Sequence, residues 1–410
     1  MSSSLQLLRK KSVIGTIQQL SSSKSISNRA LLLQALSGPS SKVHNLSIAR
    51  DTQLMHRLVD SNEKTINVLD AGTTMRFLTA YFALTGKNKI MTGTDRMKER
   101  PIGLLVDALR KLGASIDYLG AEGFPPIELQ GFGQQLTSEI EIPGNVSSQY
   151  ISALMMVAPI LPKGLLIRLK GEVGSVPYIR MTASLMEEFG VKPELNFDKG
   201  WIEVKHQPYH SAEITVEADW SSASYWFGFT ALAEEADIIL PNVSEKSLQG
   251  DRVIVEVMDR VGVKSQFENN HVRLTKKEAV EHLEWDFKDC PDLAQTVLPA
   301  CAAKGIRGEF TGLESLRIKE TDRIAALQAE LKKIGAELAE PSQGKWTLTP
   351  GIISGQAISI STYHDHRMAM GFAPWATLTD VTIESPEVVN KSYPTFWDDL
   401  RSVGFEIKEN

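Results

Sequence analysis

The sequence predicts an α/β protein built from a repeated unit of about 70 residues. Two observations lead to this fold class. A helix-like segment that ends in an apolar-Gly-apolar pattern occurs five times along the chain. After several of these glycines, apolar and polar residues alternate and then turn back, as they do in a β-hairpin. The length of 410 residues allows about two or three domains with separate cores.

A glycine directly after a predicted helix marks each repeat. The members are Gly113, Gly190, Gly262, Gly335 and Gly404, and consecutive members lie 77, 72, 73 and 69 residues apart. Glycine supplies the left-handed conformation that ends many helices, because it has no Cβ atom. Residues 197–206 (FDKGWIEVKH) and 342–350 (SQGKWTLTP) then predict hairpins. Chance recurrence is the alternative, and the near-equal spacing disfavours it.

A period of about 70 residues is too long for a solenoid repeat and suits a compact βαβαββ unit. Six such units would fill the chain, so one should precede Gly113. In that region the helix-like run 52–62 (TQLMHRLVDSN) leads almost directly into residues 67–77 (NVLDAGTTMRF). The run ends at Asn62, 51 residues before Gly113. We therefore expect the first unit to lack a hairpin.

Composition disfavours several classes of protein. The 44 basic and 50 acidic side chains give a charge of −6, which argues against nucleic-acid binding through a broad basic face but not against a concentrated basic pocket. Cys290 and Cys301 form no CxxC pair, so neither a disulfide framework nor a zinc site is expected. The sequence has no signal-peptide run and no apolar stretch of ~18–20 residues. We expect a cytoplasmic protein that does not associate with membranes.

Short polar motifs open several apolar, helix-like runs, whereas no Walker P-loop and no GxGxxG motif occurs. In residues 21–36 (SSSKSISNRALLLQAL), Lys24, Ser25 and Arg29 lie at the start of such a run. Helix N-termini bind anions, and cations there oppose the helix dipole unless an anion neutralises them. The motif therefore indicates an anion site, with a solvated basic turn as the alternative.

Three further motifs have the same form, although each could be an ordinary helix cap. The first has Asp70 and Gly72 before Thr73 and Thr74. The second offers Arg96, Lys98 and Arg100, with Pro101 expected at the first helical position. The third offers Ser147, Ser148 and Gln149.

Two motifs near the C-terminus combine cations with acidic groups. In RIKETDRI, Lys319, Glu320 and Arg323 surround a helix start for which Thr321 is a candidate cap. Glu320 could belong to a salt-bridged surface or act as an acid/base group tuned by its neighbours. In YHDHRMAM, Asp365 is a candidate N-cap that precedes His366 and Arg367. A metal site at His364, Asp365 and His366 is disfavoured, because i,i+2 spacing there points the side chains apart.

Together these motifs resemble those of the 5-enolpyruvylshikimate-3-phosphate synthase family. The matching segments, in the family's order, are SKSISNRALLLQAL, DAGTTMRFL, ERPIGLLVDAL, NVSSQYISALMM, SVPYIRMT, RIKETDRI, YHDHRMAM and NKSYPTF. They extend from about residue 20 to residue 400, and KETDR followed by DHRMAM is highly specific. Residues 147–149 (Ser-Ser-Gln) are similar to the class found in enterobacteria and plants.

The resemblance implies two similar α/β domains, each of three βαβαββ units (an inverse α/β barrel), with a ligand cleft between them. The first-and-last-segment domain would comprise residues 1–21 and 218–410 and serve phosphoenolpyruvate and catalysis. The inserted domain, residues 22–217, would bind shikimate 3-phosphate. The chain would act as a monomer on these two small molecules, with neither nucleic acid nor membrane as a partner.

The resemblance also implies roles for individual residues. Shikimate 3-phosphate would contact Lys24, Ser25, Arg29, Ser147, Ser148, Gln149, Ser175, Tyr178, Asp292, Ser315 and Lys319. Phosphoenolpyruvate would contact Lys24, Gly72, Arg100, Gln149, Glu320, Arg323, Arg367 and Lys391. Asp292 would be the base for the attacking hydroxyl, Glu320 and Lys24 would move protons at the methylene carbon and bridging oxygen, and Lys391 would assist phosphate departure. The scheme requires no metal and no cofactor.

Three positions depart from the family pattern. Asp70 replaces the usual Asn before Ala-Gly-Thr, Phe77 replaces a Pro, and Ser315 replaces an Asn. Asp70 and Phe77 leave sensitivity to glyphosate-like inhibitors open, and Ser315 weakens one implied substrate contact.

Two other functions compete with this one. The sister enolpyruvyl transferase for UDP-N-acetylglucosamine commonly has a reactive Cys in the loop before its Arg-Pro, whereas this loop reads GTDRMKERP. A non-catalytic phospho-ligand binding protein would not need Asp292, Glu320 and Lys391 together.

Overall fold

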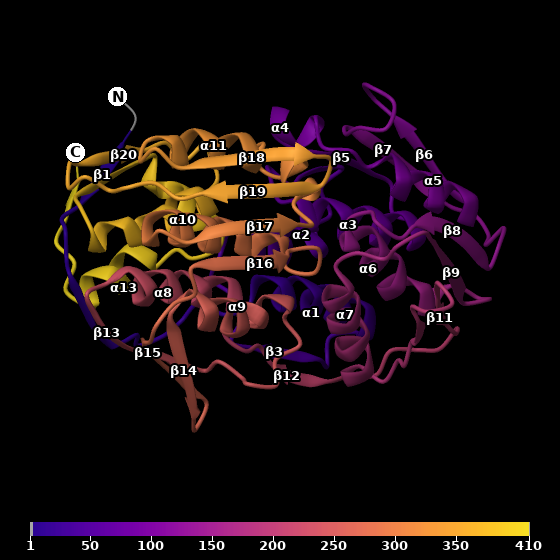
Figure 1. Cartoon of the computed structure of the whole chain (residues 1–410). Helices are drawn as coiled ribbons and strands as arrows, with labels where there is room; N and C mark the ends of the chain where they lie inside the picture. Colours follow the sequence, from indigo (N-terminus) through magenta and orange to yellow (C-terminus); the bar gives the residue numbers. More distant parts are fainter. Residues whose placement is uncertain (1–2, 410) are drawn as a thin grey trace. The chain divides into compact units, whose positions relative to one another are not determined.

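The computed structural model describes residues 3–409 as a mixed α/β chain (Figure 1). The chain divides into two compact units. Unit 1 runs to Ser23, includes Ile48–Arg50 and resumes at Glu217. Unit 2 comprises Lys24–Ser47 and Asp51–Val216. No helix among the described residues is long and apolar enough to cross a membrane.

Two four-stranded sheets of unit 2 follow the βαβαββ plan. The first contains β4 (Thr65–Asn67), α3 (Gly72–Leu84), β5 (Lys89–Thr92), α4 (Asp95–Lys98), α5 (Gly103–Leu112), β6 (Ala114–Tyr118) and β7 (Ile127–Phe132). The second contains β8 (Glu139–Pro143), α6 (Ser148–Val157), β9 (Leu165–Lys170), α7 (Val176–Glu188), β10 (Glu194–Asn196) and β11 (Trp201–Val204). The strand orders are β4-β5-β7-β6 and β10-β11-β9-β8, and in each sheet the first two strands in sequence are parallel.

The third sheet of unit 2 has only two strands. It pairs β3 (Lys42–His44) with β12 (Glu213–Thr215) in parallel, and it is accompanied by α1 (Lys24–Ser37) and α2 (Arg50–Val59). After α2 the chain enters β4 without an intervening hairpin. The prediction that the first unit is short and lacks a hairpin is therefore confirmed.

Unit 1 contains three four-stranded sheets. The first joins β2 (Ser12–Thr16), α8 (Trp220–Leu232), β13 (Glu235–Pro241), α9 (Ile254–Val261), β14 (Val263–Glu268) and β15 (His271–Lys276). The second joins β16 (His282–Asp286), α10 (Ala294–Lys304), β17 (Arg307–Thr311), α11 (Arg323–Lys332), β18 (Glu337–Ser342) and β19 (Lys345–Thr349). Figure 1 shows these last four strands side by side, in the order β16-β17-β19-β18.

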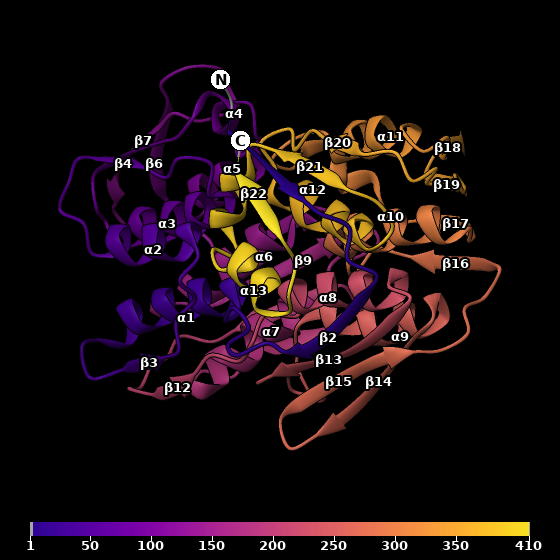
Figure 2. The ribbon, with the colours of Figure 1, turned by 90° about the vertical axis from the view of Figure 1, so that its left-hand side faces the viewer.

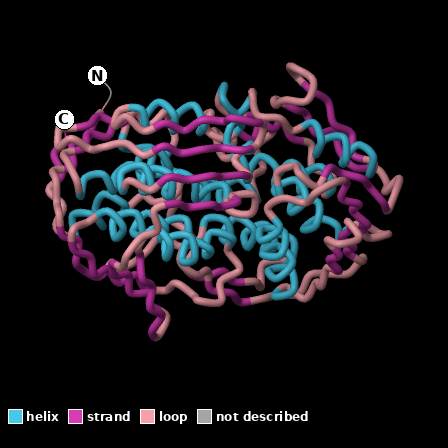
Figure 3. The backbone as a smooth tube through the Cα atoms, viewed as in Figure 1, coloured by secondary structure: helices cyan, strands magenta, loops and turns pink. Residues whose placement is uncertain are grey.

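The last sheet of unit 1 combines the two ends of the chain. It contains β20 (Ile358–Ile360), α12 (His366–Phe372), β21 (Val381–Glu384), α13 (Phe396–Ser402) and β22 (Ile407–Glu409). Its fourth strand is β1 (Ser4–Leu7), which pairs antiparallel with both β21 and β22 (Figure 2). Residues 3–409 thus form six sheets, which match the six units that the sequence predicts, and helices accompany the three sheets of each unit (Figure 3).

The first helix of each βαβαββ unit is buried on nearly all sides. In unit 1 these helices are α8, α10 and α12, which pack on one another, and in unit 2 they are α1, α3 and α6. Trp220, Trp226 and Phe229 of α8 are each completely buried. A helix that is apolar all round must lie inside the protein. Their N-termini are therefore fixed by the surrounding core, and those of α1, α3, α6 and α12 carry polar motifs.

The second helix of most units ends as the glycine pattern predicts. Gly113, Gly190, Gly262, Gly335 and Gly404 all adopt φ values between +75° and +115°. This part of the sequence analysis is confirmed, because that conformation strains residues that carry a Cβ atom.

Two predicted helix starts were wrong. Helix α5 begins at Gly103 with Ile102 as its N-cap, so Pro101 precedes the helix instead of opening it. The Pro101 carbonyl accepts hydrogen bonds from Arg76 (2.8 Å) and from the Tyr150 hydroxyl. Helix α11 is capped by Asp322 instead of Thr321. The Asp322 carboxylate accepts from two backbone N–H groups of the first turn at 3.1 Å, which a carboxylate does well.

Gly335 and Gly262, two of the left-handed glycines that end the second helices, allow a test of why glycine is needed at these positions. Gly335→Ala should lower the free energy of unfolding by about 1–2 kcal/mol, the strain of a left-handed residue, because nothing lies within 4 Å of the added methyl group. Gly262→Ala should lower it further, since the methyl group would lie 3.0 Å from the Lys277 carbonyl oxygen. Urea unfolding of the two variants measures the difference. Equal losses would contradict the contribution assigned to the Lys277 contact.

Candidate active site

Most of the polar motifs lie at or just before helix N-termini in the two units. In unit 1 the motif residues surround the starts of α8, α10, α11 and α12. In unit 2 they lie at the starts of α1, α3 and α6. Unpaired N–H groups and the positive end of the helix dipole favour anions at such positions. The two sets are described separately below.

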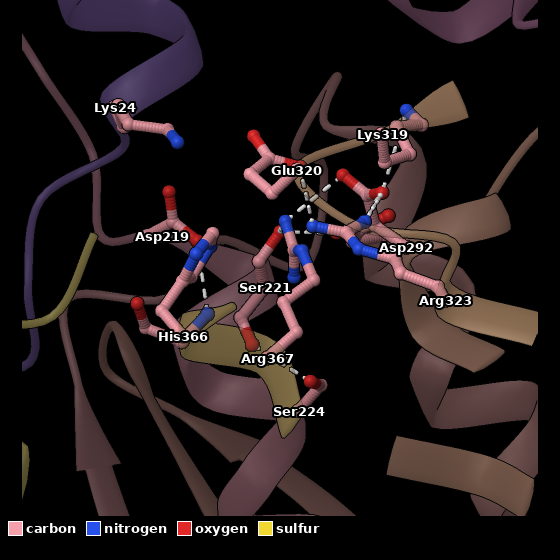
Figure 4. A network of polar contacts seen from close by, with 12 residues as sticks. Lys24, Asp219, Ser221, Ser224, Asp292, Lys319, Glu320, Arg323, His366 and Arg367 are labelled. Carbon is pink, nitrogen blue, oxygen red and sulfur yellow. Dashed lines mark hydrogen bonds and ion pairs between the residues drawn. The ribbon is translucent and has the colours of Figure 1, made fainter. Parts of the chain in front are cut away.

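Arg323 is the centre of the set in unit 1 (Figure 4). Its guanidinium is nearly inaccessible to solvent and binds three carboxylates. Nε donates to Asp365 (2.7 Å), Nη1 donates to Asp292 (2.8 Å), and Nη2 donates to Glu320 (2.9 Å). The planar fork of arginine suits this arrangement, because its donors point in fixed directions. Burial opposes the charge of Arg323, but the carboxylates raise the pKa of the guanidinium above its usual value.

Asp292 connects Arg323 to a second arginine. One oxygen accepts from Arg323, and the other accepts from Arg367 Nη2 at 2.9 Å. Lys319 Nζ lies 3.6 Å from the first oxygen. Burial would raise the pKa of Asp292, but Arg367, Lys319 and Arg323 outweigh burial and hold this pKa well below its usual range. Asp292 is therefore a carboxylate firmly held in its ionised form.

Arg367 and Asp365 occupy the start of α12. Asp365 caps the helix, as predicted, by accepting from the Arg367 backbone N–H at 2.9 Å. The Arg367 guanidinium also donates to the Tyr225 hydroxyl (3.2 Å) and to Ser221 Oγ (3.3 Å). Glu320 contacts a further cation, since Lys391 Nζ lies 3.8 Å from its carboxylate. We call these residues the carboxylate–cation cluster: Asp292, Lys319, Glu320, Arg323, Asp365, Arg367 and Lys391.

No group of three His, Cys, Asp or Glu residues suited to a metal ion occurs within residues 3–409. Asp365, which a metal site in YHDHRMAM would use, is instead paired with Arg323. Burial raises the pKa of both Cys290 and Cys301 to about 12, so both are protonated thiols at neutral pH.

Arg29 is the most enclosed cation of the set in unit 2. Its guanidinium donates to Thr182 Oγ1 (2.7 Å), to the Ser25 carbonyl (2.9 Å) and to Ser152 Oγ (3.2 Å). It also lies over the ring of Phe77, with its central carbon 5.3 Å from the ring centroid. Burial lowers the pKa of Arg29 to about 10, and it remains charged at pH 7. The Phe77 departure from the family pattern therefore provides an aromatic contact for Arg29.

Lys24 and Arg100 are placed near helix starts by local contacts. Lys24 opens α1, and its ammonium group lies 3.2 Å from the buried carboxylate of Asp51. Arg100 donates to the Asp70 carbonyl (3.4 Å) and lies against Gly72 at the start of α3. A Cβ atom on Gly72 would lie 2.7 Å from Arg100 Nη2. Glycine is thus required for the guanidinium to approach this helix N-terminus.

The remaining predicted residues of unit 2 lie on α6 and α7. Ser147 caps α6, and its hydroxyl accepts from the Gln149 backbone N–H (3.4 Å). The Gln149 amide donates to Thr73 Oγ1 at 3.1 Å, which links α6 to α3. Ser148 is buried in the first turn of α6. Ser175 precedes α7 in a left-handed conformation with φ of 54°, and the ring of Tyr178 lies 6.0 Å from the Arg29 guanidinium carbon.

Ser315 is exposed on the short helix Glu314–Ile318.

Several polar residues at these helix starts were not predicted as site residues from sequence. They are Asp51, Ser221, Tyr225 and Asp251. The segments ARDT, DWSSASY and QGD that contain them look like ordinary caps and turns. Only the tertiary structure brings these side chains next to the predicted cations.

Removal of Arg323 tests the carboxylate–cation cluster. Arg323→Met should lower the free energy of unfolding at pH 8 by about 3–5 kcal/mol, because three carboxylates lose their shared cation. The loss should shrink toward pH 5. A carboxylate of the folded variant that has lost this cation takes up a proton more readily, which relieves the uncompensated charge as the pH falls, so the loss is smaller at pH 5 than at pH 8.

Arg273→Met is the matched control, because Arg273 makes a two-point pair with Asp237 on the half-exposed face of β15. Its effect should be small and nearly independent of pH. Urea unfolding of both variants at several pH values compares them. A loss for Arg323→Met that is equal at pH 5 and pH 8 would contradict the electrostatic explanation.

The comparisons with known proteins agree with one another. The sequence profile of EPSP synthase (3-phosphoshikimate 1-carboxyvinyltransferase) matches residues 57–400. A 3-phosphoshikimate 1-carboxyvinyltransferase of Bacteroides fragilis is 48% identical over 406 residues, covering 98% of each chain. The enzyme of that name from Photobacterium profundum is 34% identical and covers 93% of this chain and 94% of its own. EPSP synthase of Acinetobacter baumannii has a similar fold, with a TM-score of 0.78 over all of both chains at 20% identity. The chain therefore belongs to the EPSP synthase (3-phosphoshikimate 1-carboxyvinyltransferase) family.

Proposed function

We propose that this chain transfers the enolpyruvyl group of phosphoenolpyruvate to the 5-hydroxyl of shikimate 3-phosphate and releases phosphate. The carboxylate–cation cluster carries this proposal. Binding of anions alone needs cations, but it does not need Asp292 and Glu320 placed among them. A reaction that moves protons beside two anionic substrates needs both kinds of group.

Asp292 would accept the proton of the attacking hydroxyl, and the bound substrates would prepare it for that role. In the ligand-free protein Arg367, Lys319 and Arg323 depress the pKa of Asp292 and make it a weak base. Substrate phosphate and carboxylate groups would draw these cations away from Asp292. The pKa of Asp292 would then rise because burial is no longer outweighed. The base would become effective only when the substrates are bound.

The other proton transfers would use Glu320 of unit 1 and Lys24 of unit 2. Attack of the hydroxyl oxygen on C2 of phosphoenolpyruvate requires a proton at the methylene carbon, and expulsion of phosphate then requires removal of a proton from the new methyl group. Glu320 and Lys24 would carry out these transfers. Lys391, which is buried beside Glu320, would stabilise the departing phosphate.

The binding roles would be shared by residues of both units. Unit 2 would hold shikimate 3-phosphate through the starts of α1, α6 and α7, and unit 1 would supply the catalytic groups. Phosphoenolpyruvate would use the arginines, because their forks match its carboxylate and phosphate. Those residues are Arg100, Arg323 and Arg367, together with Lys24, Gly72, Gln149 and Lys391. Shikimate 3-phosphate would use Lys24, Ser25, Arg29, Ser147, Ser148, Gln149, Ser175, Tyr178, Asp292, Ser315 and Lys319. We further propose that the enzyme works as a cytoplasmic monomer.

A phosphate-release assay tests the function directly. The purified chain should release phosphate only when shikimate 3-phosphate and phosphoenolpyruvate are both present, and mass spectrometry should find the enolpyruvyl ether product. Release with UDP-N-acetylglucosamine in place of shikimate 3-phosphate would identify the sister activity. Binding of both anions without release would identify a phospho-ligand binding protein.

Glu320→Gln separates binding from chemistry. The amide keeps the size of the side chain, so affinity for both substrates should stay within about threefold. Turnover should fall by about 10²–10⁴, because the group that moves the proton is lost. Steady-state kinetics and calorimetry measure the two effects. Glu314→Gln, on the exposed helix before the same motif, is the control that should keep wild-type turnover. Equal turnover in Glu320→Gln and wild type would remove Glu320 from the mechanism.

Arg100→Ala tests the division of the binding residues. The variant should weaken phosphoenolpyruvate binding by about 10–100-fold, because a charge-assisted contact beside the α3 N-terminus is lost. Affinity for shikimate 3-phosphate should change far less. Calorimetry with each substrate, and with phosphoenolpyruvate in the presence of shikimate 3-phosphate, makes the comparison. Arg96→Ala on the exposed helix α4 is the control. Equal losses for both substrates would count against this division.

A further inference from the structure

We propose that Asp251 is a positioning residue of the active site, which fixes the orientation of Arg367 through the hydroxyl of Ser221. This inference rests on the proposed function, because Arg367 is there a phosphoenolpyruvate ligand. Asp251 lies on the short helix Gly250–Val253, and Ser221 lies in the first turn of α8. The two residues are 30 positions apart in the sequence and meet beside the carboxylate–cation cluster.

Ser221 lies between the carboxylate and the guanidinium. Its hydroxyl donates a short hydrogen bond to Asp251 Oδ2, and its oxygen accepts from Arg367 Nη2 at 3.3 Å. A hydroxyl has one proton, so a proton given to Asp251 leaves only lone pairs facing Arg367. Asp251 thereby makes Ser221 an acceptor for the guanidinium. Figure 4 shows Ser221, Arg367 and Asp292 close together.

The other contacts of Arg367 show how the Ser221 oxygen helps to orient the guanidinium. Nη2 donates to Asp292 at 2.9 Å as well as to Ser221, and Nη1 donates to the Tyr225 hydroxyl at 3.2 Å. In the proposed function Asp292 exchanges its cations for substrate and becomes the base. Ser221 and Tyr225 then hold the guanidinium plane while its partner Asp292 changes. A fixed plane is what bidentate binding of phosphate or carboxylate requires.

The segment that carries Asp251 is attached to the start of α8 by a second side chain. The Gln249 amide accepts from the Trp220 backbone N–H (3.1 Å) and donates to the Ala218 carbonyl (2.8 Å). Gln249 and Asp251, which are two residues apart in the sequence, thus both contact residues 218–221. Gln249 holds the segment in place, and the Asp251 carboxylate contacts the Ser221 side chain from the same segment.

Asp251 is 2% exposed, and a buried carboxylate is unfavourable unless it is compensated. Burial raises the pKa of Asp251 to about 6. Arg367 and the hydrogen bond from Ser221 lower this pKa, whereas the negative charges of Asp292 and Asp219 raise it. The buried thiol of Cys290 is close enough to Asp251 for the negative charge of Asp251 to raise the pKa of the thiol. A neutral side chain would fill the same space more favourably. The charge is therefore explained by what it does to Ser221 and Arg367.

A double-mutant cycle tests the proposal with phosphate release as the readout. Asp251→Asn and Ser221→Ala should each raise KM for phosphoenolpyruvate by about tenfold, while KM for shikimate 3-phosphate changes less than about twofold. In the Ser221→Ala background, Asp251→Asn should add less than about twofold, because Asp251 acts through that hydroxyl. Glu384→Gln is the control, since Glu384 accepts from Ser359 and Ser361 away from Arg367, and its KM values should match wild type.

The possible outcomes separate the two proposals. Independent, multiplicative effects of the two substitutions would overturn the inference, as would equal changes in KM for both substrates. If Asp251→Asn does not fold, a wild-type KM for phosphoenolpyruvate in Ser221→Ala overturns it by itself. A wild-type enzyme that releases no phosphate from the two substrates would instead refute the proposed function. An active wild type with an unaffected Asp251→Asn refutes only the role of Asp251.

Discussion

The guanidinium of Arg323 is the one charge around which unit 1 arranges its active-site groups. It binds carboxylates from the starts of three helical segments, namely Asp292 before α10, Glu320 before α11 and Asp365 before α12. Asp365 is fully buried, and Asp292 and Glu320 are largely shielded from solvent, so a shared cation favours their ionised forms. One arginine therefore fixes the relative positions of the groups to which the proposed function assigns binding and proton transfer.

This arrangement places the cluster near charge balance before any ligand arrives. Lys319, Arg367 and Lys391 surround the carboxylates that Arg323 holds, so cations and carboxylates are already paired with one another. An anionic substrate must compete with Asp292 and Glu320 for these cations. We infer that the competition couples binding to chemistry, because the carboxylates displaced by substrate are those that must accept or donate protons. The main consequence of these ion pairs is that each cation can exchange a carboxylate for an anionic group of a substrate. Their contribution to stability is secondary.

The fold could be predicted largely from periodicity. The left-handed glycines, the hairpins and the short first unit all follow from local rules that glycine and alternating residues obey. The first residue of a helix was harder to predict, because Thr321 and Asp322 are both good N-caps and only the structure shows that Asp322 caps α11. The place of β1 in the last sheet could not be predicted, since pairing between residues near the two ends leaves no trace in local pattern.

The candidate site shows the same division between local and long-range information. Lys24, Arg100 and Arg323 could be singled out as candidates because they stand at or shortly before helix starts, where a cation is locally unfavourable. Asp51, Ser221 and Asp251 could not, because each looks like a common cap or turn residue on its own segment. Their roles arise from contacts across 27 or more sequence positions.

The strand β1 also has a consequence for how the chain is made. Its partners β21 and β22 begin at Val381 and Ile407, so Ser4–Leu7 have no pairing edge until those residues have been synthesised. Unit 2 has all its strands by Val216 and can fold while the ribosome is still producing unit 1. The strand β1 therefore enters its sheet only after unit 2 and most of the described part of unit 1 have been synthesised.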